Sequence, residues 1–246
     1  MLWGKLPFPP DPLPSSVMAA SPPSRTSVTR WATFDCYGTL IDWNLGIRKE
    51  FERLFGVEEA PRLLDRYHEL EPEIESDEFH TYREVMALAL EKLAQEESIH
   101  LPEGEAGGLA RSLPEWPPFP EVPGALAELR GRGWKLAILS NTDRDLIAAS
   151  QQRLGVPVDL AIVAEDVESY KPAHAHWERF FEATTADRDH HVHVGASLFH
   201  DIRPARELDL RTVWINRLDE TADPEPDREL PDLSRLPDTL DELVVA

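Results

Sequence analysis

Residues 34–43 read FDCYGTLIDW, and the architecture of the chain can be worked out from this stretch. The apolar run 31–34 ends at the carboxylate of Asp35, and a turn containing Gly38 and Thr39 follows at once. A strand that ends there holds Asp35 rigidly and places free backbone N–H groups of the turn around it. This pattern predicts a nucleophilic carboxylate. The alternative interpretation is a strand end followed by an Asp that caps a helix.

Five short segments rich in β-branched and apolar residues are predicted to be strands. Helical patterns separate most of them, which predicts an α/β fold with a doubly wound parallel sheet and helices on both faces. The acidic, Pro-containing segment 219–236 is expected to be a loop, with a last helix near residues 239–244. The predicted strands are residues 28–34, 135–139, 160–164, 191–194 and 211–215.

The segment between the first two predicted strands is much longer than a crossover needs, since about a dozen residues suffice. It is therefore expected to be a small domain above the carboxyl ends of the strands, where open α/β sheets bind ligands. Its helical patterns are residues 45–55, 62–75 and 81–97.

We accordingly predict three parts of the chain. Residues 1–27 are expected to be a disordered Pro-rich tail, because they lack the continuous apolar run of a signal peptide. Residues 28–43 and 121–246 are expected to form the core domain, and residues 44–120 a helical cap domain.

Composition excludes several classes of partner. The formal net charge of −21 argues against nucleic acid, whose phosphates need a basic surface, and against anionic membranes. No apolar stretch is long enough to span a bilayer. The single cysteine, Cys36, excludes an internal disulfide framework and suits the cytoplasm. We expect a cytoplasmic protein that acts on a small molecule and can form a homodimer.

Four predicted strands lead to polar residues that can do chemistry. Asp35 follows the first, Ser140 and Asn141 follow the second, Lys171 lies just beyond the third, and Asp201 follows the fourth. Because these ends converge on one crevice in a doubly wound sheet, the side chains are expected to meet there.

The order of these residues resembles the motifs of the haloacid dehalogenase superfamily. The first motif of that family opens with an Asp and has a Thr four residues later, matched here by Asp35 and Thr39. Family phosphatases usually carry a second Asp two positions after the first, where this chain has Tyr37, a residue typical of the 2-haloacid dehalogenase branch. The resemblance covers roughly residues 28–218 and implies a Rossmann-like core with a helical cap inserted after the first motif.

The resemblance also implies a reaction. Asp35 attacks the carbon that bears the halogen and forms an aspartyl ester, which a water then hydrolyses. Lys171 stabilises the Asp35 anion, Thr39 and turn amides hydrogen-bond its carboxyl group, and Asp201 positions or deprotonates the water. Since the ordinary pKa of Asp is about 3.9, Asp35 is ionised at neutral pH and needs only a dry pocket. The alternative for Lys171, which precedes a Pro, is a solvated loop residue.

Substrate-binding residues are expected on both domains. Ser140 and Asn141 can offer a hydroxyl and backbone N–H groups to the substrate carboxylate. Arg66 falls where similar dehalogenases place a halide-abstracting Arg on the cap. The alternative is an exposed helical Arg paired with Glu69 or Glu73.

Two aromatic residues complete the expected site. Tyr37 and Trp43 lie in or next to the first motif and are expected to line the substrate pocket. The alternative for Trp43 is a plain core residue.

No metal or cofactor is expected. Family phosphatases hold magnesium partly through an acid of the fourth motif, and Ala196 stands at that position. Asp35 and Asp201 alone make a poor set of oxygen ligands for magnesium. The histidines at 174–200 lack the spacing of a zinc site, although His200 is notable because it precedes Asp201.

Three positions depart from the dehalogenase pattern. Trp177 stands where a Tyr is usual, Leu198 where an Asn is common, and Ala196 replaces a hydroxyl residue. These changes can alter the site of the hydrolytic water or indicate a different substrate.

The leading hypothesis is a hydrolytic dehalogenase that converts 2-haloacids to 2-hydroxy acids and halide. The alternatives are a magnesium-dependent phosphatase of the same superfamily and a non-catalytic relative that binds a carboxylate. Chirality, chain length and halogen preference do not follow from the sequence.

Overall fold

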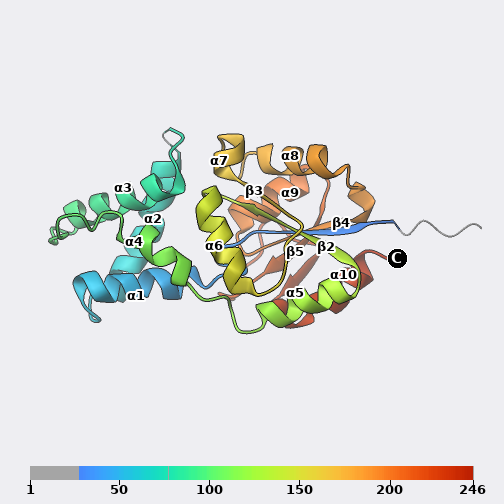
Figure 1. Ribbon diagram of the computed structural model, residues 1–246, viewed down its shortest axis with the longest axis horizontal. Coiled ribbons are helices and arrows are strands. Elements are labelled where there is room, and N and C mark those ends of the chain that lie inside the picture. The colour runs from blue at the N-terminus through green and yellow to red at the C-terminus, as the bar shows by residue number, and fades with distance from the viewer. Residues whose placement is uncertain (1–27, 77, 246) are drawn as a thin grey trace, which may run out of the picture.

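The computed structural model describes residues 28–76 and 78–245, and the predicted tail at 1–27 lies outside the described residues. A six-stranded sheet forms the centre in the order β3-β2-β1-β4-β5-β6, with all five neighbouring pairs parallel. The doubly wound α/β prediction is confirmed (Figure 1). The strands are β1 (Arg30–Phe34), β2 (Trp134–Ser140), β3 (Leu160–Val163), β4 (His191–Gly195), β5 (Arg211–Ile215) and β6 (Arg228–Leu230).

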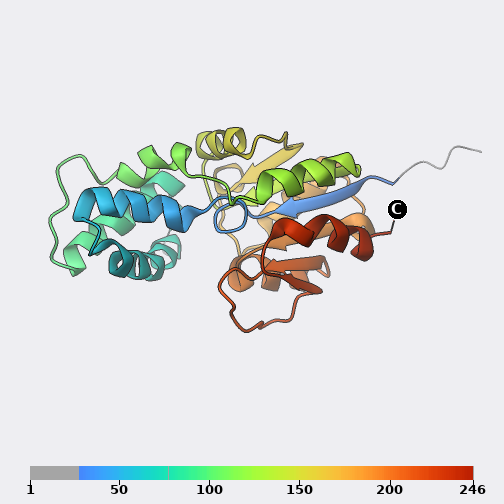
Figure 2. The ribbon, with the colours of Figure 1, turned by 90° about the horizontal axis from the view of Figure 1, so that it is seen from below.

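Side chains of the central strands alternate between two packed faces. Leu136 and Ile138 of β2 belong to the same apolar cluster as α5 and α10, whereas Ala137 and Leu139 pack with α8 and α9. Figure 2 shows α5 and α10 together on one face of the sheet. Burial on both faces explains the continuous apolar strands of the sequence. The core helices are α5 (Val122–Gly131), α6 (Arg144–Leu154), α7 (Ala164–Val167), α8 (Ala175–Thr184), α9 (Arg203–Glu207) and α10 (Leu236–Leu243).

The edge strand β6 lies in the segment 219–236, which the sequence predicts to be a loop, so that part of the prediction is wrong. Two of its three residues are exposed and charged, so no apolar alternation marks it. Its order comes from pairing with β5 and from Asp227, whose carboxylate accepts the Thr212 N–H at 2.8 Å.

Four of the five α-helices between β1 and β2 form a separate layer beside the sheet, and we call them the cap helices (Figure 1). Their apolar faces pack on one another through residues such as Leu63, Tyr67 and Leu93, each with no exposed surface. Trp116 covers Gly46 so closely that a Cβ there would lie 2.3 Å from the ring. The cap helices are α1 (Trp43–Phe55), α2 (Ala60–Glu75), α3 (Tyr82–Glu96) and α4 (Gly108–Ser112).

The two chain segments that join the cap helices to the sheet lie side by side. Asp42 N–H donates to the Pro117 carbonyl at 2.9 Å, and Phe119 N–H donates to the Leu40 carbonyl at 3.1 Å. These two backbone hydrogen bonds hold the two connecting segments together.

A second link between the two layers uses Asp143 at the start of α6. Its side chain makes no capping bond to its own helix. Its two carboxylate oxygens instead accept the N–H groups of Tyr82 and Arg83, at 2.7 and 3.1 Å, in the first turn of α3. A carboxylate of the core domain thus binds the free N–H groups at the N-terminus of α3.

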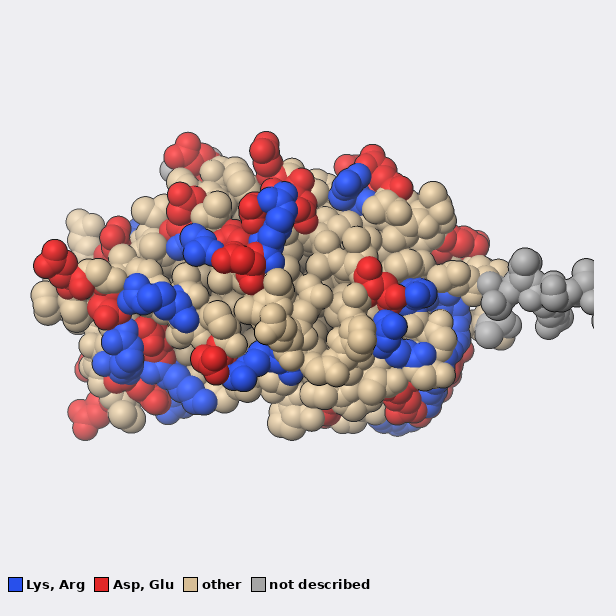
Figure 3. Space-filling model, viewed as in Figure 1, with Lys and Arg blue, Asp and Glu red and all other residues tan. Residues whose placement is uncertain are grey.

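Acidic and basic side chains are mixed over the surface. On the face in Figure 3, Lys and Arg side chains lie among Asp and Glu. Arg144, for example, pairs with Glu165 and Asp166, and Arg83 pairs with Asp145. Within 28–76 and 78–245, none of the helices is both long and apolar enough to cross a membrane.

Candidate active site

Asp35 lies directly after β1 and is held from two sides. Thr39 Oγ1 donates to its Oδ2 at 2.7 Å, and Lys171 Nζ donates to its Oδ1 at 2.9 Å. Gly38 has a φ of +91°, which lets the turn bring Thr39 back to the carboxylate. Thr39 Oγ1 also accepts the Ala196 N–H at 2.9 Å, which ties the first motif to the loop after β4.

Lys171 stands between two carboxylates. Its ammonium group, only 2% exposed, donates to Asp35 and, at 2.6 Å, to Asp201 Oδ1. Both carboxylates raise the pKa of Lys171 despite its burial, so the ammonium stays charged. One cation therefore serves two buried anions.

The two carboxylates differ in basicity. Lys171, helped by His193, holds the pKa of Asp201 well below its ordinary range. Burial raises the pKa of Asp35, and the charges of Lys171 and Asp201 act on it in opposite directions. The carboxylate at the end of β1 is therefore the more basic, and so the better nucleophile of the two.

Asp201 itself is fully enclosed. It has no exposed surface, and its Oδ2 accepts the Ser197 N–H at 3.1 Å. A Cβ on Gly195 would lie 2.5 Å from its carboxylate, so the close approach requires glycine at that position.

Asn141 positions the backbone next to Lys171. Its amide nitrogen donates to the Lys171 carbonyl at 3.0 Å and its amide oxygen accepts the Lys171 N–H at 2.7 Å. Both polar groups of the Asn141 side chain are thus bonded to the backbone of Lys171, and they hold that residue in place. Ser140, 1% exposed, lines the cavity beside it.

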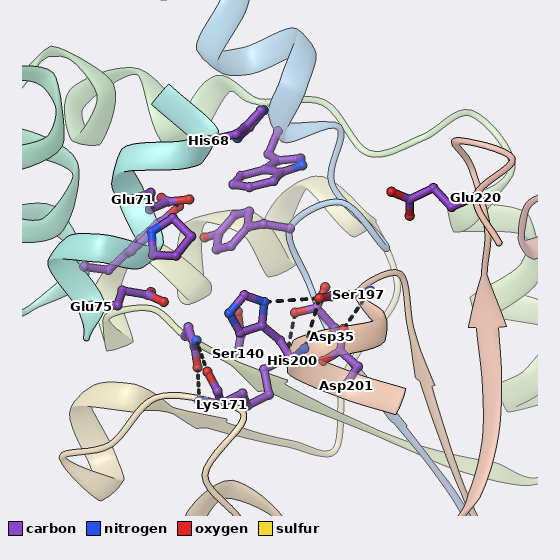
Figure 4. Close-up of a pocket in the computed structure, with 15 residues that line it drawn as sticks. Asp35, His68, Glu71, Glu75, Ser140, Lys171, Ser197, His200, Asp201 and Glu220 are labelled. Atoms are coloured by element: carbon purple, nitrogen blue, oxygen red, sulfur yellow. Dashed lines mark hydrogen bonds and ion pairs between the residues drawn. The ribbon is translucent and has the colours of Figure 1, made fainter. Parts of the chain in front are cut away.

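A cavity of about 450 Å³ opens over these groups, between the strand ends and the cap helices. Figure 4 shows Asp35, Ser197, His200 and Asp201 gathered on the core wall, facing Glu71 and Glu75 across the cavity. We call the two sides the core wall and the cap wall. The core wall contains Asp35, Tyr37, Ser140, Asn141, Lys171, Ser197, His200, Asp201 and Glu220, and the cap wall Trp43, His68, Glu71, Pro72, Glu75 and Tyr82.

Residues 29–209 match the sequence profile of the haloacid dehalogenase-like hydrolases. The chain belongs to this family. The resemblance seen in the sequence is thereby confirmed.

Individual relatives agree with the family. Haloacetate dehalogenase H-2 of Moraxella sp. (strain B) is 30% identical over 75% of this chain and 84% of its own length. A phosphoserine phosphatase of Thermus thermophilus is 32% identical over 52% of this chain and 58% of its own length. The L-2-haloacid dehalogenase of Xanthobacter autotrophicus has the same fold, with a TM-score of 0.78 and 19% identity over 87% of this chain and 98% of that chain.

Arg66, expected to face the cavity in this hydrolase, does not line it. Its guanidinium pairs with Glu69 of α2 and with Glu96 of α3 at 2.5 Å each. The expected placement is corrected: the alternative of a helical Arg paired with Glu69 describes the structure. The residues of α2 that reach the cavity are instead His68, Glu71 and Glu75.

The two aromatic residues expected in the site are both present. Tyr37 and Trp43 line the cavity. The Tyr37 hydroxyl lies 3.0 Å from Ser150 Oγ, and burial raises its pKa, which makes this phenol a weaker acid than an ordinary tyrosine. Its ring stacks on Tyr82 with centroids 5.9 Å apart. Tyr37 therefore shapes the wall.

The cap wall is acidic, a feature that the sequence pattern did not reveal. Burial raises the pKa of Glu71 to about 7, and burial together with the charge of Glu71 raises that of Glu75 to about 8. The hydroxyl groups of Tyr67 and Tyr82 donate to Glu71 at 3.3 and 3.0 Å. Lys171 is the only lysine or arginine among the described residues that line the cavity. The spacing of Glu71 and Glu75, four apart, indicates a shared helix face, but not that this face borders the site.

The residues at the strand ends do not fit a magnesium ion of the phosphatase type. Asp35 and Asp201 both accept from Lys171, and Ala196 offers no side-chain oxygen. Within the described ranges, no group of three His, Cys, Asp or Glu residues is placed to hold a metal.

Proposed function

We propose that this hydrolase is a dehalogenase that converts 2-haloacids to 2-hydroxy acids and halide through an ester on Asp35. The observation that carries the proposal is the Asp35 carboxylate itself. It is 9% exposed, more basic than its partner Asp201, and it lines the cavity. Two residues after it stands Tyr37, where family phosphatases usually have a second Asp. The family membership and the dehalogenase relative support the same reaction.

In the first step an oxygen of Asp35 bonds to the carbon that bears the halogen, and the carbon–halogen bond breaks with loss of halide. Thr39 and Lys171 keep the carboxylate aimed at the cavity. Removal of water from the carboxylate makes its attack on carbon faster. Lys171 stays charged throughout because Asp201 remains its partner.

In the second step a water attacks the carbonyl carbon of the Asp35 ester. The alcohol leaves as the 2-hydroxy acid, and Asp35 is restored with an oxygen from water. Thr39 Oγ1 and Lys171 Nζ contact different oxygens of Asp35, so once one oxygen carries the ester, the donor on the other oxygen stabilises the charge that develops there.

The substrate carboxylate and the halide meet neutral donors in this cavity. Ser140 and Trp43, whose side chains carry a hydroxyl and an indole N–H, line it together with Glu71 and Glu75. We therefore propose that an anionic haloacid binds toward Ser140, away from the two glutamates.

The test is free halide after incubation with chloroacetate, bromoacetate and both enantiomers of 2-chloropropionate. Halide release, together with an ester adduct on the Asp35 peptide after brief exposure, would support the proposal. Two outcomes would contradict it: magnesium-dependent hydrolysis of p-nitrophenyl phosphate without halide release, and absence of turnover with all of these compounds.

A further inference from the structure

Four buried polar side chains form a row that starts at Asp201. It continues through His193 and Thr33 to His191, and none of the four has exposed surface. Thr33 Oγ1 lies 2.9 Å from His193 Nδ1 and 2.8 Å from His191 Nε2. On the other side of its ring, His193 Nε2 lies 3.6 Å from Asp201 Oδ1. Because Thr33 and His193 are partners in the pairing of β1 with β4, the sheet fixes the row next to Asp201.

The charge of Asp201 decides which nitrogen of His193 carries the proton. Burial lowers the pKa of His193, so its ring is neutral and carries one N–H. On Nε2 this proton faces the negative Oδ1 of Asp201, whereas a lone pair there would be repelled. Nδ1 then accepts the hydroxyl proton of Thr33, whose oxygen accepts the Nε2–H of His191. The row therefore donates in one direction, toward Asp201.

The far end of the row agrees with this direction. Among the described residues, His191 Nδ1 is buried and has no hydrogen-bond partner. If the row donated the other way, Nδ1 would carry the proton, and a buried N–H would lack an acceptor, which is costly. With the proton on Nε2, the Nδ1 of His191 holds only a lone pair, and each ring N–H of the row faces an oxygen.

Trp177 encloses the imidazole of His193. The two rings meet edge to face, with centroids 5.0 Å apart and an angle of 70° between their planes, and Trp177 has no exposed surface. This packing excludes water from the imidazole and restricts its rotation. A Tyr is usual at this position in the dehalogenase pattern, so in this chain the ring that encloses His193 replaces a residue with a hydroxyl group.

The other groups around Asp201 leave one of its acceptor sites open. Lys171, which Asp35 shares, donates to Oδ1 at 2.6 Å, and the Ser197 N–H donates to Oδ2 at 3.1 Å. The adjacent ring of His200 is neutral, because burial lowers its pKa to about 4. A carboxylate has about four acceptor sites. The ammonium and the imidazole N–H of the row face Oδ1, so the second site on Oδ2 remains for a water from the cavity that Asp201 lines.

Resting on the function proposed above, we propose that His193 is a positioning residue for the hydrolysis of the Asp35 ester. Its Nε2–H, oriented by Thr33 and His191, holds Asp201 as an anion and restricts rotation of the carboxylate. Asp201 in turn positions or deprotonates the water, as the family resemblance implies. His193 acts only through Asp201, so its removal should slow the hydrolysis of the ester and spare its formation.

The first test reads the tautomer directly and needs no substrate. In protein whose histidines carry nitrogen-15, long-range proton–nitrogen correlation spectra should show the His193 proton on Nε2 and a bare Nδ1. The signals are assigned by their loss in His193→Gln. A proton on Nδ1 would overturn the proposal even in an active enzyme.

The second test separates the two steps of the reaction by rapid-quench halide release with the best haloacid. His193→Phe keeps an aromatic ring but has no N–H, so it should release about one halide per active site in a burst and then turn over roughly 10- to 100-fold slower. The ester should accumulate on the Asp35 peptide. His193→Gln, whose amide N–H can face Asp201, should recover most of the turnover.

Two controls accompany these variants. Thr33→Val removes the hydroxyl that orients the ring, and it should lower turnover less than His193→Phe does. His174→Phe replaces a surface histidine that lies 3.0 Å from Glu207, and it should leave both steps unchanged. Urea unfolding shows whether each variant is folded.

The role of His193 is wrong if His193→Phe hydrolyses the ester at the wild-type rate, or if the folded variant loses the burst along with turnover. Absence of both halide release and adduct in the wild type would instead contradict the proposed function, and this role with it.

Discussion

The two walls of the cavity differ in how they are built. The core wall places Asp35, Ser140 and Asp201 at or just after parallel strands, where sheet geometry fixes their positions. The cap wall is largely one face of α2, with Glu71 and Glu75 one turn apart. In the proposed reaction the core wall supplies the covalent chemistry, whereas the cap wall contributes side chains that face the substrate.

The largest expected effect tests the core wall at its centre. Asp35→Ala should lower halide release by on the order of 10⁵-fold, because it removes the atom that bonds to the substrate. The exposed Asp65→Ala on α2 is the matched control and should keep wild-type activity. Residual release above 1% of wild type would place the nucleophile elsewhere.

Lys171→Met should affect both activity and stability. It leaves Asp35 and Asp201 buried without their shared cation, which costs about 3–5 kcal/mol in the free energy of unfolding. Turnover should decrease by roughly 10²–10³-fold. Urea unfolding and halide release measure the two effects.

The control is Lys135→Met, which removes an exposed ion pair with Asp159 and should change stability far less. Equal losses in the two variants would show that the core wall does not depend on its buried cation.

A smaller effect tests the cap wall. As pH rises through about 7 and then about 8, Glu71 and Glu75 lose their protons and the cavity becomes more negative. The kcat/KM for an anionic haloacid should therefore decrease between pH 6.5 and 9. Glu75→Gln should raise kcat/KM about fivefold at pH 9, which corresponds to about 1 kcal/mol of relieved repulsion. A decrease at pH 9 would mean that Glu75 binds the substrate through favourable contacts.

The smallest effect concerns Arg66. Because this residue pairs with Glu69 and Glu96 outside the cavity, Arg66→Ala should change kcat/KM by less than about twofold. A loss of 10²-fold in halide release would show that α2 rotates during the reaction and carries Arg66 inward.

The core was predictable from the sequence because strand ends carry their own signal. Asp35, Lys171 and Asp201 each follow a predicted strand. In the structure, Lys171 donates a hydrogen bond to each of the two carboxylates. The edge strand β6 was not predictable, since only its neighbour and Asp227 order it.

The cap wall was not predictable for a different reason. Periodicity gives the apolar face of α2, but both Arg66 and His68 are partly buried residues beside it. Which of them meets the cavity depends on how α2 packs on α1 and α3, a tertiary property that sequence spacing does not contain. The position of Asp143 directly before α6 likewise does not reveal its partner, since its side chain makes no capping bond to α6 and accepts an N–H group of α3.

The carboxylate of Asp143 is also a contact that any movement of the cap helices away from the sheet must break. When the cap helices move away, the Tyr82 and Arg83 amides exchange this carboxylate for water, while the Thr81–Glu84 pair stays with α3. Loss of such a cap costs on the order of 1 kcal/mol. Taken alone, a link of about 1 kcal/mol would leave roughly one molecule in six open at any moment, so entry would need no unfolding of the core.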